Sequence, residues 1–275
     1  MVFRVSRLSV ITTKRLQNTG LKEADALSSG RKGHPMKLSK GTPMPYPKLR
    51  GAMEGLRYPV YCEAKIDGEL NWLCHKKGNG NYLINKSGKI RTQMPATDVL
   101  IEHDLLGELH WGDGKKGALY EFLKHQKDDN LRFTAFDIDI PGPYIERRFK
   151  LIQTVSPTSH VSVIPVTICN NRAEAMAAYR KYVDEGYEGA VFKSFDTRLV
   201  MGNCSWVKMK FIETKLCTIS SIDPSRERIE VDKQTGVKVP TIEKKKLKVG
   251  QIVEIEHLGE LASGALRNPV YKPGE

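Results

Sequence analysis

Five short segments of this sequence carry the side chains that could do chemistry. The first is Glu63-Ala64-Lys65-Ile66-Asp67-Gly68, in which a lysine follows a short apolar run. A lysine amine attacks electrophiles when it is uncharged, and neighbouring cations and burial both lower its pKa. The other segments supply carboxylates, an aromatic ring and more lysines: Leu106-Gly107-Glu108-Leu109, Phe133-Thr134-Ala135-Phe136-Asp137, Glu188-Gly189-Ala190-Val191-Phe192-Lys193 and Trp206-Val207-Lys208-Met209-Lys210.

These residue types suit phosphoryl chemistry at Lys65. Lys208 and Lys210 would neutralise the charge that grows on phosphate oxygens, and their positive field would lower the pKa of Lys65. Glu188 is the best metal candidate, because Mg²⁺ prefers hard oxygen ligands beside phosphates. Taken singly, each segment has an ordinary structural explanation. A K-x-D-G tetrapeptide is usually a turn, and Phe136 suits core packing equally well.

The ordered set of segments resembles the covalent nucleotidyltransferases (ATP-dependent DNA ligases, RNA ligases and mRNA capping enzymes) over about residues 61–210. The resemblance implies ATP as cofactor, with Mg²⁺, or Mn²⁺ in its place, held by Glu188 and Glu108. It implies that Lys65 takes AMP and that Asp67 helps to orient the attack at a nick. It also implies nucleotide contacts from Glu63 (adenine amino group), Ile66, Glu108 (ribose), Phe136 (adenine stacking), Lys193 (α-phosphate), Lys208 and Lys210.

Three features are similar to the DNA-ligase branch. Phe136-Asp137-Ile138 precedes an Arg147-Arg148 pair, Trp206 stands directly before the Lys-x-Lys segment, and residues 264–269 read G-A-L-R-N-P. We therefore expect a DNA ligase that seals nicked duplex DNA. An RNA ligase or other lysyl-nucleotidyltransferase, and a non-catalytic nucleic-acid-binding protein with the same fold, remain alternatives.

The sequence also departs from that branch. Leu70 stands where DNA ligases carry an arginine, and Lys86 replaces the arginine expected to touch the nick, with Arg91 able to compensate. Lysine keeps the charge but loses the bidentate fork. An R-x-D-K motif that orients pyrophosphate has no counterpart up to Glu275, so we expect either that Lys272 or the Lys244 to Lys248 run substitutes, or that charging with ATP is less efficient than sealing. In that run, we expect Lys244, Lys245, Lys246 and Lys248 to touch DNA, although a solvated turn explains the run equally well.

Composition sets the broad class. The chain has 275 residues and a net charge of +12, which favours a polyanionic partner. Its five cysteines are scattered without zinc-ligand spacing, so we interpret them as packing residues of a reduced compartment. With neither a secretory signal nor a membrane-length apolar run, we expect a cytoplasmic, monomeric protein that binds no membrane, in the host cytoplasm if its origin is viral.

The elements that must position these side chains are short strands and a few helices. Apolar, β-branched and aromatic runs predict strands at residues 58–64, 70–74, 82–85, 105–109, 133–140, 161–166 and 190–193. Helical patterning appears at 117–127, 145–154 and most clearly at 172–184, where Ala175, Met176, Tyr179 and Val183 share a face. We expect an α+β class of packed antiparallel sheets with helices, followed by a small OB-fold β-barrel.

Three regions follow from these patterns. Residues 1–35 form a basic N-terminal arm, in which residues 2–5 alternate like a short strand. Residues 36–212 form the nucleotidyltransferase domain, and residues 213–275 form the OB-fold domain. A transit peptide is the alternative interpretation of the arm.

Overall fold

The structure is a computed structural model in which most of the chain is described. The first described residue is Pro45, so the basic arm and its expected strand lie outside the described residues. The described residues belong to one compact unit. The described ranges are 45–76, 80–92, 94–124, 129–223, 225–232, 234–239, 244–261 and 263–273.

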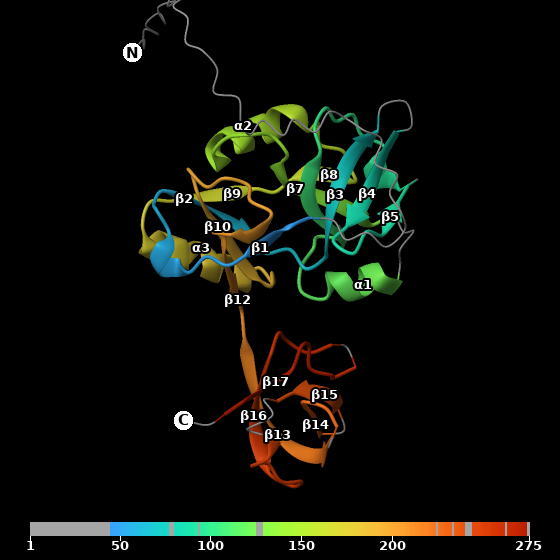
Figure 1. The fold of residues 1–275 in the computed structure, drawn as a ribbon, viewed down its shortest axis with the longest axis vertical. Coiled ribbons are helices and arrows are strands. Elements are labelled where there is room, and N and C mark those ends of the chain that lie inside the picture. The colour runs from blue at the N-terminus through green and yellow to red at the C-terminus, as the bar shows by residue number, and fades with distance from the viewer. Residues whose placement is uncertain are drawn as a thin grey trace, which may run out of the picture. The chain divides into compact units, whose positions relative to one another are not determined.

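A six-stranded sheet forms one wall of the region that holds the five segments (Figure 1). Its strand order is β5-β4-β3-β6-β7-β8, with all neighbours antiparallel except β7 and β8. The strands are β3 (Glu69–Lys76), β4 (Gly80–Asn85), β5 (Ile90–Arg91), β6 (Leu105–Trp111), β7 (Leu131–Ile138) and β8 (Val161–Val163).

A four-stranded antiparallel sheet, in the order β12-β10-β2-β9, forms the second wall. Its strands are β2 (Val60–Ala64), β9 (Val166–Cys169), β10 (Gly189–Ser194) and β12 (Val207–Lys210). A parallel pair, β1 (Pro47–Leu49) and β11 (Gly202–Cys204), leads into β12. Lys65 therefore directly follows β2, and Lys208 and Lys210 lie on β12.

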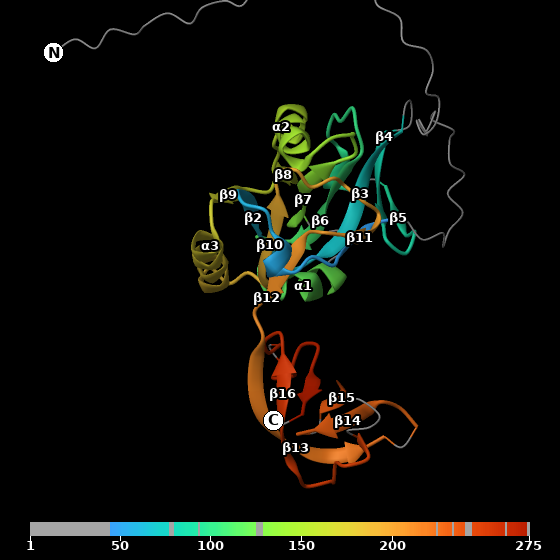
Figure 2. The ribbon, with the colours of Figure 1, turned by 60° about the vertical axis from the view of Figure 1, so that its left-hand side comes forward.

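Helices cover the outer faces of the two sheets. Figure 2 shows α3 (Arg172–Asp184) beside β9 and β10. Its buried residues are Ala175, Ala178 and Tyr182, so the buried face is centred elsewhere than expected, and Met176 and Val183 are only partly covered. Helix α2 (Tyr144–Thr154) packs on β7, and α1 (Ala118–Lys124) packs on β6. The two 3-10 helices are η1 (Met53–Gly55) and η2 (Pro95–Thr97).

The residues after β12 form a closed barrel in the order β13-β14-β15-β17-β16. Its strands are β13 (Glu213–Ile222), β14 (Arg228–Val231), β15 (Gln234–Lys238), β16 (Ile252–His257) and β17 (Val270–Lys272). Alternate residues, such as Cys217 and Ile219 on β13 and Val253 and Ile255 on β16, form its core. A closed five-stranded barrel agrees with the expected OB fold.

The α+β prediction is confirmed, with one difference in detail. The apolar run at 161–166 does not form one strand: it divides into β8 and the start of β9, which lie in different sheets. Strands β15 and β17 close the barrel, and β15 pairs with β17 in parallel. All five cysteines are free and buried, as expected of packing residues. No helix among the described residues is long and apolar enough to cross a membrane.

Candidate active site

Strand alternation gathers the reactive side chains on one face of the four-stranded sheet. Lys208 on β12 lies opposite Val191 on β10, which lies opposite Glu63 on β2. Successive side chains of a strand point to opposite faces, so Lys210 shares this face. The intervening residues, including Ala64, Ala190, Phe192 and Val207, instead pack in the core against α3. The alternation of side chains along these strands therefore places the reactive residues on one face of the sheet and the core residues on the other.

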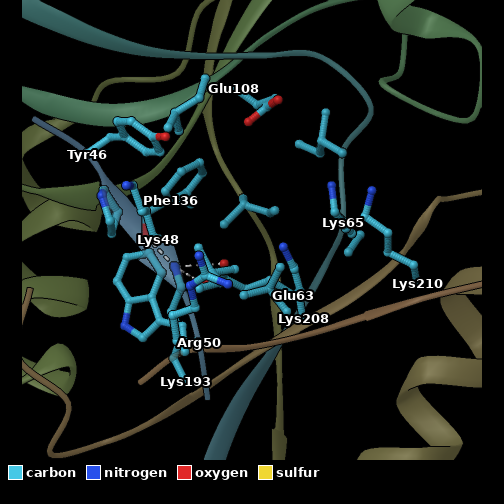
Figure 3. Close-up of a pocket in the computed structure, with 18 of the residues that line it drawn as sticks. Tyr46, Lys48, Arg50, Glu63, Lys65, Glu108, Phe136, Lys193, Lys208 and Lys210 are labelled. Carbon is cyan, nitrogen blue, oxygen red and sulfur yellow. Dashed lines mark hydrogen bonds and ion pairs between the residues drawn. The ribbon is translucent and has the colours of Figure 1, made fainter. Parts of the chain in front are cut away.

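A cavity of about 540 Å³ lies between this face and the six-stranded sheet. From the six-stranded sheet Glu108, Leu70 and Phe136 line it, and from the other side Lys65 and Ile66 do (Figure 3). The cavity therefore brings together residues from all five sequence segments. The rest of the lining comprises Tyr46, Pro47, Lys48, Leu49, Arg50, Glu63, Ala64, Lys86, Ile164, Val191, Lys193, Trp206, Lys208 and Lys210.

The Lys65 amine lies among carboxylates. Its Nζ is 2.6 Å from Oε2 of Glu188, and the Lys210 Nζ is 2.5 Å from the other oxygen of that carboxylate. Burial alone would lower the pKa of Lys65, but the negative charges of Glu188, Glu108 and Asp67 together raise it. The expectation of a lowered pKa at Lys65 is therefore wrong for this arrangement, because the nearest charges are negative.

A lowered lysine pKa occurs instead at Lys208 on β12, the second strand from β2 in the sheet. Burial, followed by the positive charges of Lys210, Lys65 and Arg50, lowers the pKa of Lys208. Lys208 has an exposed side chain that lines the cavity beside other basic side chains. Such a cluster is suited to an anion with several charges.

The expected metal ligands form a partial set. Burial, with help from Glu188, Asp67 and Glu69, raises the pKa of Glu108 to about 8, against the opposing charge of Lys65. Among the described residues, no group of three or more His, Cys, Asp or Glu side chains has the geometry of a metal cage. Two carboxylates fit a Mg²⁺ ion that keeps waters and borrows phosphate oxygens.

A second charged cluster closes the other end of the cavity. Lys193 is 1% exposed, and its Nζ is 2.8 Å from Glu63 Oε2 and 3.0 Å from the Phe136 carbonyl oxygen. The hydroxyl of Tyr144 also donates to Glu63. The Lys193 amine lies 4.1 Å from the ring centre of Trp206. Lys193 is thus bound to the expected adenine-reading residue, whereas the Lys65 amine is bound to Glu188.

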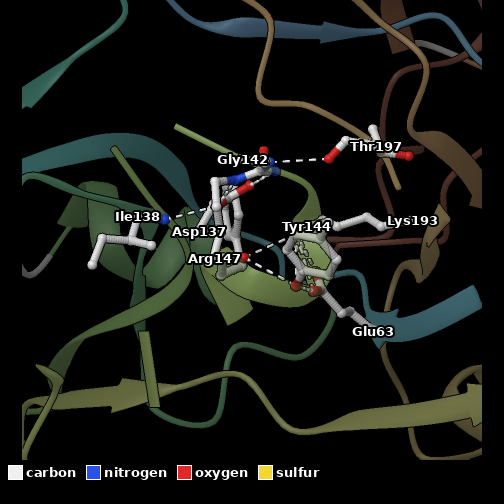
Figure 4. Close-up of polar contacts among 9 residues, drawn as sticks. Glu63, Asp137, Ile138, Gly142, Tyr144, Arg147, Lys193 and Thr197 are labelled. Carbon is white, nitrogen blue, oxygen red and sulfur yellow. Dashed lines mark hydrogen bonds and ion pairs between the residues drawn. The ribbon is translucent and has the colours of Figure 1, made fainter. Parts of the chain in front are cut away.

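The Phe136-Asp137-Ile138 and Arg147-Arg148 segments have a structural explanation in these contacts. Arg147 is fully buried and makes two hydrogen bonds to Asp137, Nε to Oδ1 at 2.8 Å and Nη2 to Oδ2 at 2.9 Å (Figure 4). Its Nη1 donates to the carbonyl oxygens of Gly142 and Thr197. This fork joins the end of β7 to α2 and to the chain after β10, and so fixes Phe136 at the cavity and Tyr144 beside Glu63.

Asp67 is held from two sides. Its Oδ2 accepts from the Gly117 backbone N–H at 2.7 Å, and both carboxylate oxygens accept from Nη2 of Arg267, at 2.8 and 2.9 Å. Arg267 belongs to the G-A-L-R-N-P segment that follows β16, and its side chain is 4% exposed. In this arrangement Asp67 does not line the cavity. Its carboxylate is occupied by an arginine of the barrel region.

The expected nucleic-acid residues have different surroundings. Lys86 is exposed and lines the cavity. Arg91 is buried, and its Nη1 lies 2.6 Å from Glu69 Oε2, so its charge is already paired within the sheet. The Lys244 amine donates to the carbonyl oxygens of Asp223 and Arg226. Exposed side chains of the run are those of Lys245, Lys246 and Lys248.

Sequence reasoning missed Tyr46, Lys48 and Arg50, which line the cavity from the N-terminal side. Residues 29–51 have the composition of a loop, and that composition hid strand β1. The available signal was the alternation of Lys48 and Arg50 with Pro47 and Leu49. In β1 and just after it the two basic residues are exposed, while Pro47 is buried and Leu49 packs against a core.

Comparison with known proteins identifies the family. The model of the ATP dependent DNA ligase domain matches residues 44–210, more than half of the chain. "Probable DNA ligase" proteins of Dictyoglomus thermophilum and Dictyoglomus turgidum are 28% and 36% identical to the chain over 181 residues. Each match covers 54% of this chain and 30% of the relative. The chain thus spans less than a third of the length of these curated relatives.

Solved structures share the fold. A Lig E DNA ligase, described as binding DNA with a minimal scaffold, superposes with a TM-score of 0.68 at 15% identity, covering 83% of this chain and 98% of that one. The ligase domain of LigD from M. tuberculosis superposes with a TM-score of 0.51 at 18% identity, covering 84% and 94%. With its five segments converging on one cavity and a family match over most of that region, the chain belongs to the ATP-dependent DNA ligase domain family.

Proposed function

We propose that this protein is an ATP-dependent DNA ligase that seals nicks in duplex DNA through an adenylated Lys65. The observation that carries the proposal is the position of the Lys65 amine at a cavity that residues of all five segments line, in contact with Glu188. A half-buried amine at such a cavity, beside a lysine pair, is what transfer of a nucleotide to a lysine requires.

The proposed chemistry has three steps. Lys65 Nζ loses a proton and forms a bond to the α-phosphorus of ATP, while the bond from that phosphorus to the bridging oxygen breaks and pyrophosphate leaves. An oxygen of the 5′-phosphate at a nick then bonds to the α-phosphorus, while the phosphorus–nitrogen bond to Lys65 breaks and the amine regains a proton. Finally the 3′-hydroxyl loses a proton, attacks the 5′-phosphorus and releases AMP. Throughout, Lys208 and Lys210 balance negative charge on the nonbridging oxygens.

Several groups would orient the nucleotide. Glu63 and Phe136 would contact adenine, and Glu108 would contact the ribose. Glu188 and Glu108 would hold Mg²⁺, which when bound would neutralise phosphate charge. Lys86 would touch the DNA at the nick. Nicked duplex DNA as substrate and a monomeric, cytoplasmic protein complete the proposal.

The test is covalent labelling with ATP that is radioactive at the α-phosphate. We expect Mg²⁺-dependent transfer of label to the protein, lost in Lys65→Arg, which keeps the positive charge but not the reactive amine. Lys89→Arg, a similar change at a lysine that does not line the cavity, should label normally. Absence of a Lys65-dependent adduct would leave a non-catalytic nucleic-acid-binding protein.

The choice between DNA and RNA ligase needs a second substrate comparison. Matched nicked duplexes, all-DNA or with RNA on either side of the nick, are incubated with the enzyme and ATP. We expect sealing of the all-DNA nick. Sealing confined to the RNA-containing duplexes would contradict the DNA-ligase assignment while leaving Lys65 adenylation intact.

A further inference from the structure

The cavity holds more positive charge than the protein itself neutralises. Its lining includes seven basic residues (Lys48, Arg50, Lys65, Lys86, Lys193, Lys208 and Lys210) but only two acidic ones (Glu63 and Glu108). Three of the seven have a carboxylate partner: Lys65 and Lys210 share Glu188, and Lys193 pairs with Glu63. Within the part of the chain that the structure describes, the other four have no carboxylate at ion-pair distance. Four such cations around one cavity favour the binding of a ligand with several negative charges.

Two of these four cations, Lys48 and Arg50, come from β1 and the residue after it, and main-chain hydrogen bonds fix their place. Beyond the register pair of Leu49 with Cys204, the Arg50 N–H donates to the Cys204 carbonyl at 2.8 Å. The Gly51 N–H donates to the Trp206 carbonyl at 3.1 Å. The pairing of β1 therefore continues up to the residue before β12, which carries Lys208.

Gly51 makes this approach close. A Cβ atom on Gly51 would lie 1.9 Å from the Ser205 carbonyl oxygen and 2.9 Å from Cγ2 of Val207. Only glycine allows the backbone after Arg50 to lie this near the start of β12. The arginine is thus held beside the Lys-x-Lys strand by backbone contacts, although its side chain is exposed.

The electrostatics agree with that placement. After burial and the two lysines Lys210 and Lys65, Arg50 is the next cation that lowers the pKa of Lys208. Figure 3 shows Lys48 and Arg50 at the same cavity as Lys208. A cluster that depresses the pKa of one of its own members is stabilised when an anion binds.

We propose that Arg50, assisted by Lys48, binds the β- and γ-phosphates of ATP and so holds the pyrophosphate that leaves Lys65. This inference rests on the proposed function, in which Glu63 and Phe136 mark the adenine end and Lys65 marks the α-phosphate. Arg50 lies near enough to Lys208 to lower its pKa, and the cations of the lining that have no carboxylate partner are the groups available to the rest of the triphosphate. A guanidinium donates two parallel hydrogen bonds to phosphate oxygens, which a lysine cannot do.

The test compares affinities for two nucleotides by titration calorimetry. The first is α,β-methylene-ATP, which carries the whole triphosphate but cannot transfer AMP, and the second is AMP. For Arg50→Gln we expect an at least roughly tenfold loss of affinity for the triphosphate and less than about a twofold change for AMP. Lys48→Met should act in the same direction with a smaller loss.

The matched control is Arg180→Gln, the same chemical change on α3, which packs on the opposite face of the β2–β10 sheet. It should leave both affinities unchanged. An equal loss for AMP and triphosphate in Arg50→Gln, or no loss for either, would overturn the inference.

A second measurement distinguishes binding of Arg50 to the phosphates of ATP from binding of Arg50 to the phosphates of DNA. Sealing of a nick that already carries AMP on its 5′-phosphate needs no triphosphate, so Arg50→Gln should seal it at the wild-type rate. Slow sealing together with unchanged triphosphate affinity would assign Arg50 to the nick and overturn the inference. Arg50-dependent triphosphate binding without any Lys65 adduct would instead refute only the proposed ligase activity. Wild-type protein that binds neither nucleotide would refute both.

Discussion

At the scale of single residues, the site is organised by pairs of opposite charge. Glu188 accepts from both Lys65 and Lys210, and burial is outweighed by those two cations, so the pKa of Glu188 is lowered. Glu63 and Lys193 form a second such pair, beside Phe136 and Trp206, with 3% and 1% of their side chains exposed. Because a buried charge without a partner is costly, each pair fixes the position of both members.

The Glu63–Lys193 pair gives a stability prediction. Lys193→Met should lower the free energy of unfolding by about 3–5 kcal/mol, because it leaves the Glu63 carboxylate buried with only the Tyr144 hydroxyl as donor. Urea unfolding at pH 7 measures the change. Adding Glu63→Gln to Lys193→Met removes the unpaired charge and should recover part of the loss. A double variant no more stable than Lys193→Met would show that the pair does not act through charge.

At the scale of elements, the sequence predicted the strands that carry or precede the first four segments, because they are apolar, β-branched runs. Helix α3 was predicted with the observed ends, since Asn171 caps it and Gly186 follows it with a φ of 92°. The sequence did not predict β1, whose three residues depend on pairing with β11 more than 150 positions later. Local patterns cannot reveal such pairings, and for that reason Lys48 and Arg50 were missed.

The same limit applies to charges. The five segments identified the residues around Lys65, but their separation in sequence does not say which oppositely charged partners meet. The shift of the Lys65 pKa was consequently predicted with the wrong sign, whereas that of Lys208 has the lowered direction expected of a lysine among cations. Lys193 was predicted at the α-phosphate, and only the register of β10 against β2 reveals its bond to Glu63.

The close packing of β1 gives a prediction at this scale. Gly51→Ala should lower the free energy of unfolding by about 1–3 kcal/mol, because its Cβ overlaps the Ser205 backbone. It should also weaken triphosphate binding by displacing Arg50. Gly55→Ala is the matched control, since no atom lies within 4 Å of a Cβ there. Chemical unfolding of both variants decides the matter, and equal stabilities would contradict the close approach.

At the scale of the whole molecule, the net charge of +12 is the sum of +5 in residues 1–35, +6 in residues 36–212 and +1 in residues 213–275. Binding of duplex DNA should weaken steeply as salt rises, because each phosphate contact releases counterions. Arg267 of the barrel region also forms an ion pair with Asp67, two residues after Lys65. Ligase cycles require such contacts to form and break as the substrate changes from ATP to DNA.

The salt dependence of DNA binding can be tested with two variants of the lysine run at residues 244–248, one of which is the control. Lys245→Gln should reduce the slope of log K against log salt for a nicked duplex by about 1, because its exposed amine is expected on a phosphate. Lys244→Gln should leave the slope unchanged, since its amine is already bound to two backbone carbonyls. Binding is measured by fluorescence anisotropy across salt concentrations. Equal slopes for Lys245→Gln and wild type would exclude Lys245 from the DNA contact.

The alternation of side chains along β12 limits how this strand can change in length. Val207 and Met209 face the core while Lys208 and Lys210 face the carboxylates, so deleting one residue between Trp206 and Lys210 would exchange the two sets. Both amines would then be buried among alanines and phenylalanine, and two apolar side chains would meet the phosphates. Insertions and deletions in this strand can therefore be tolerated only two residues at a time. Point substitutions, in contrast, can alter the cavity and the core independently of each other.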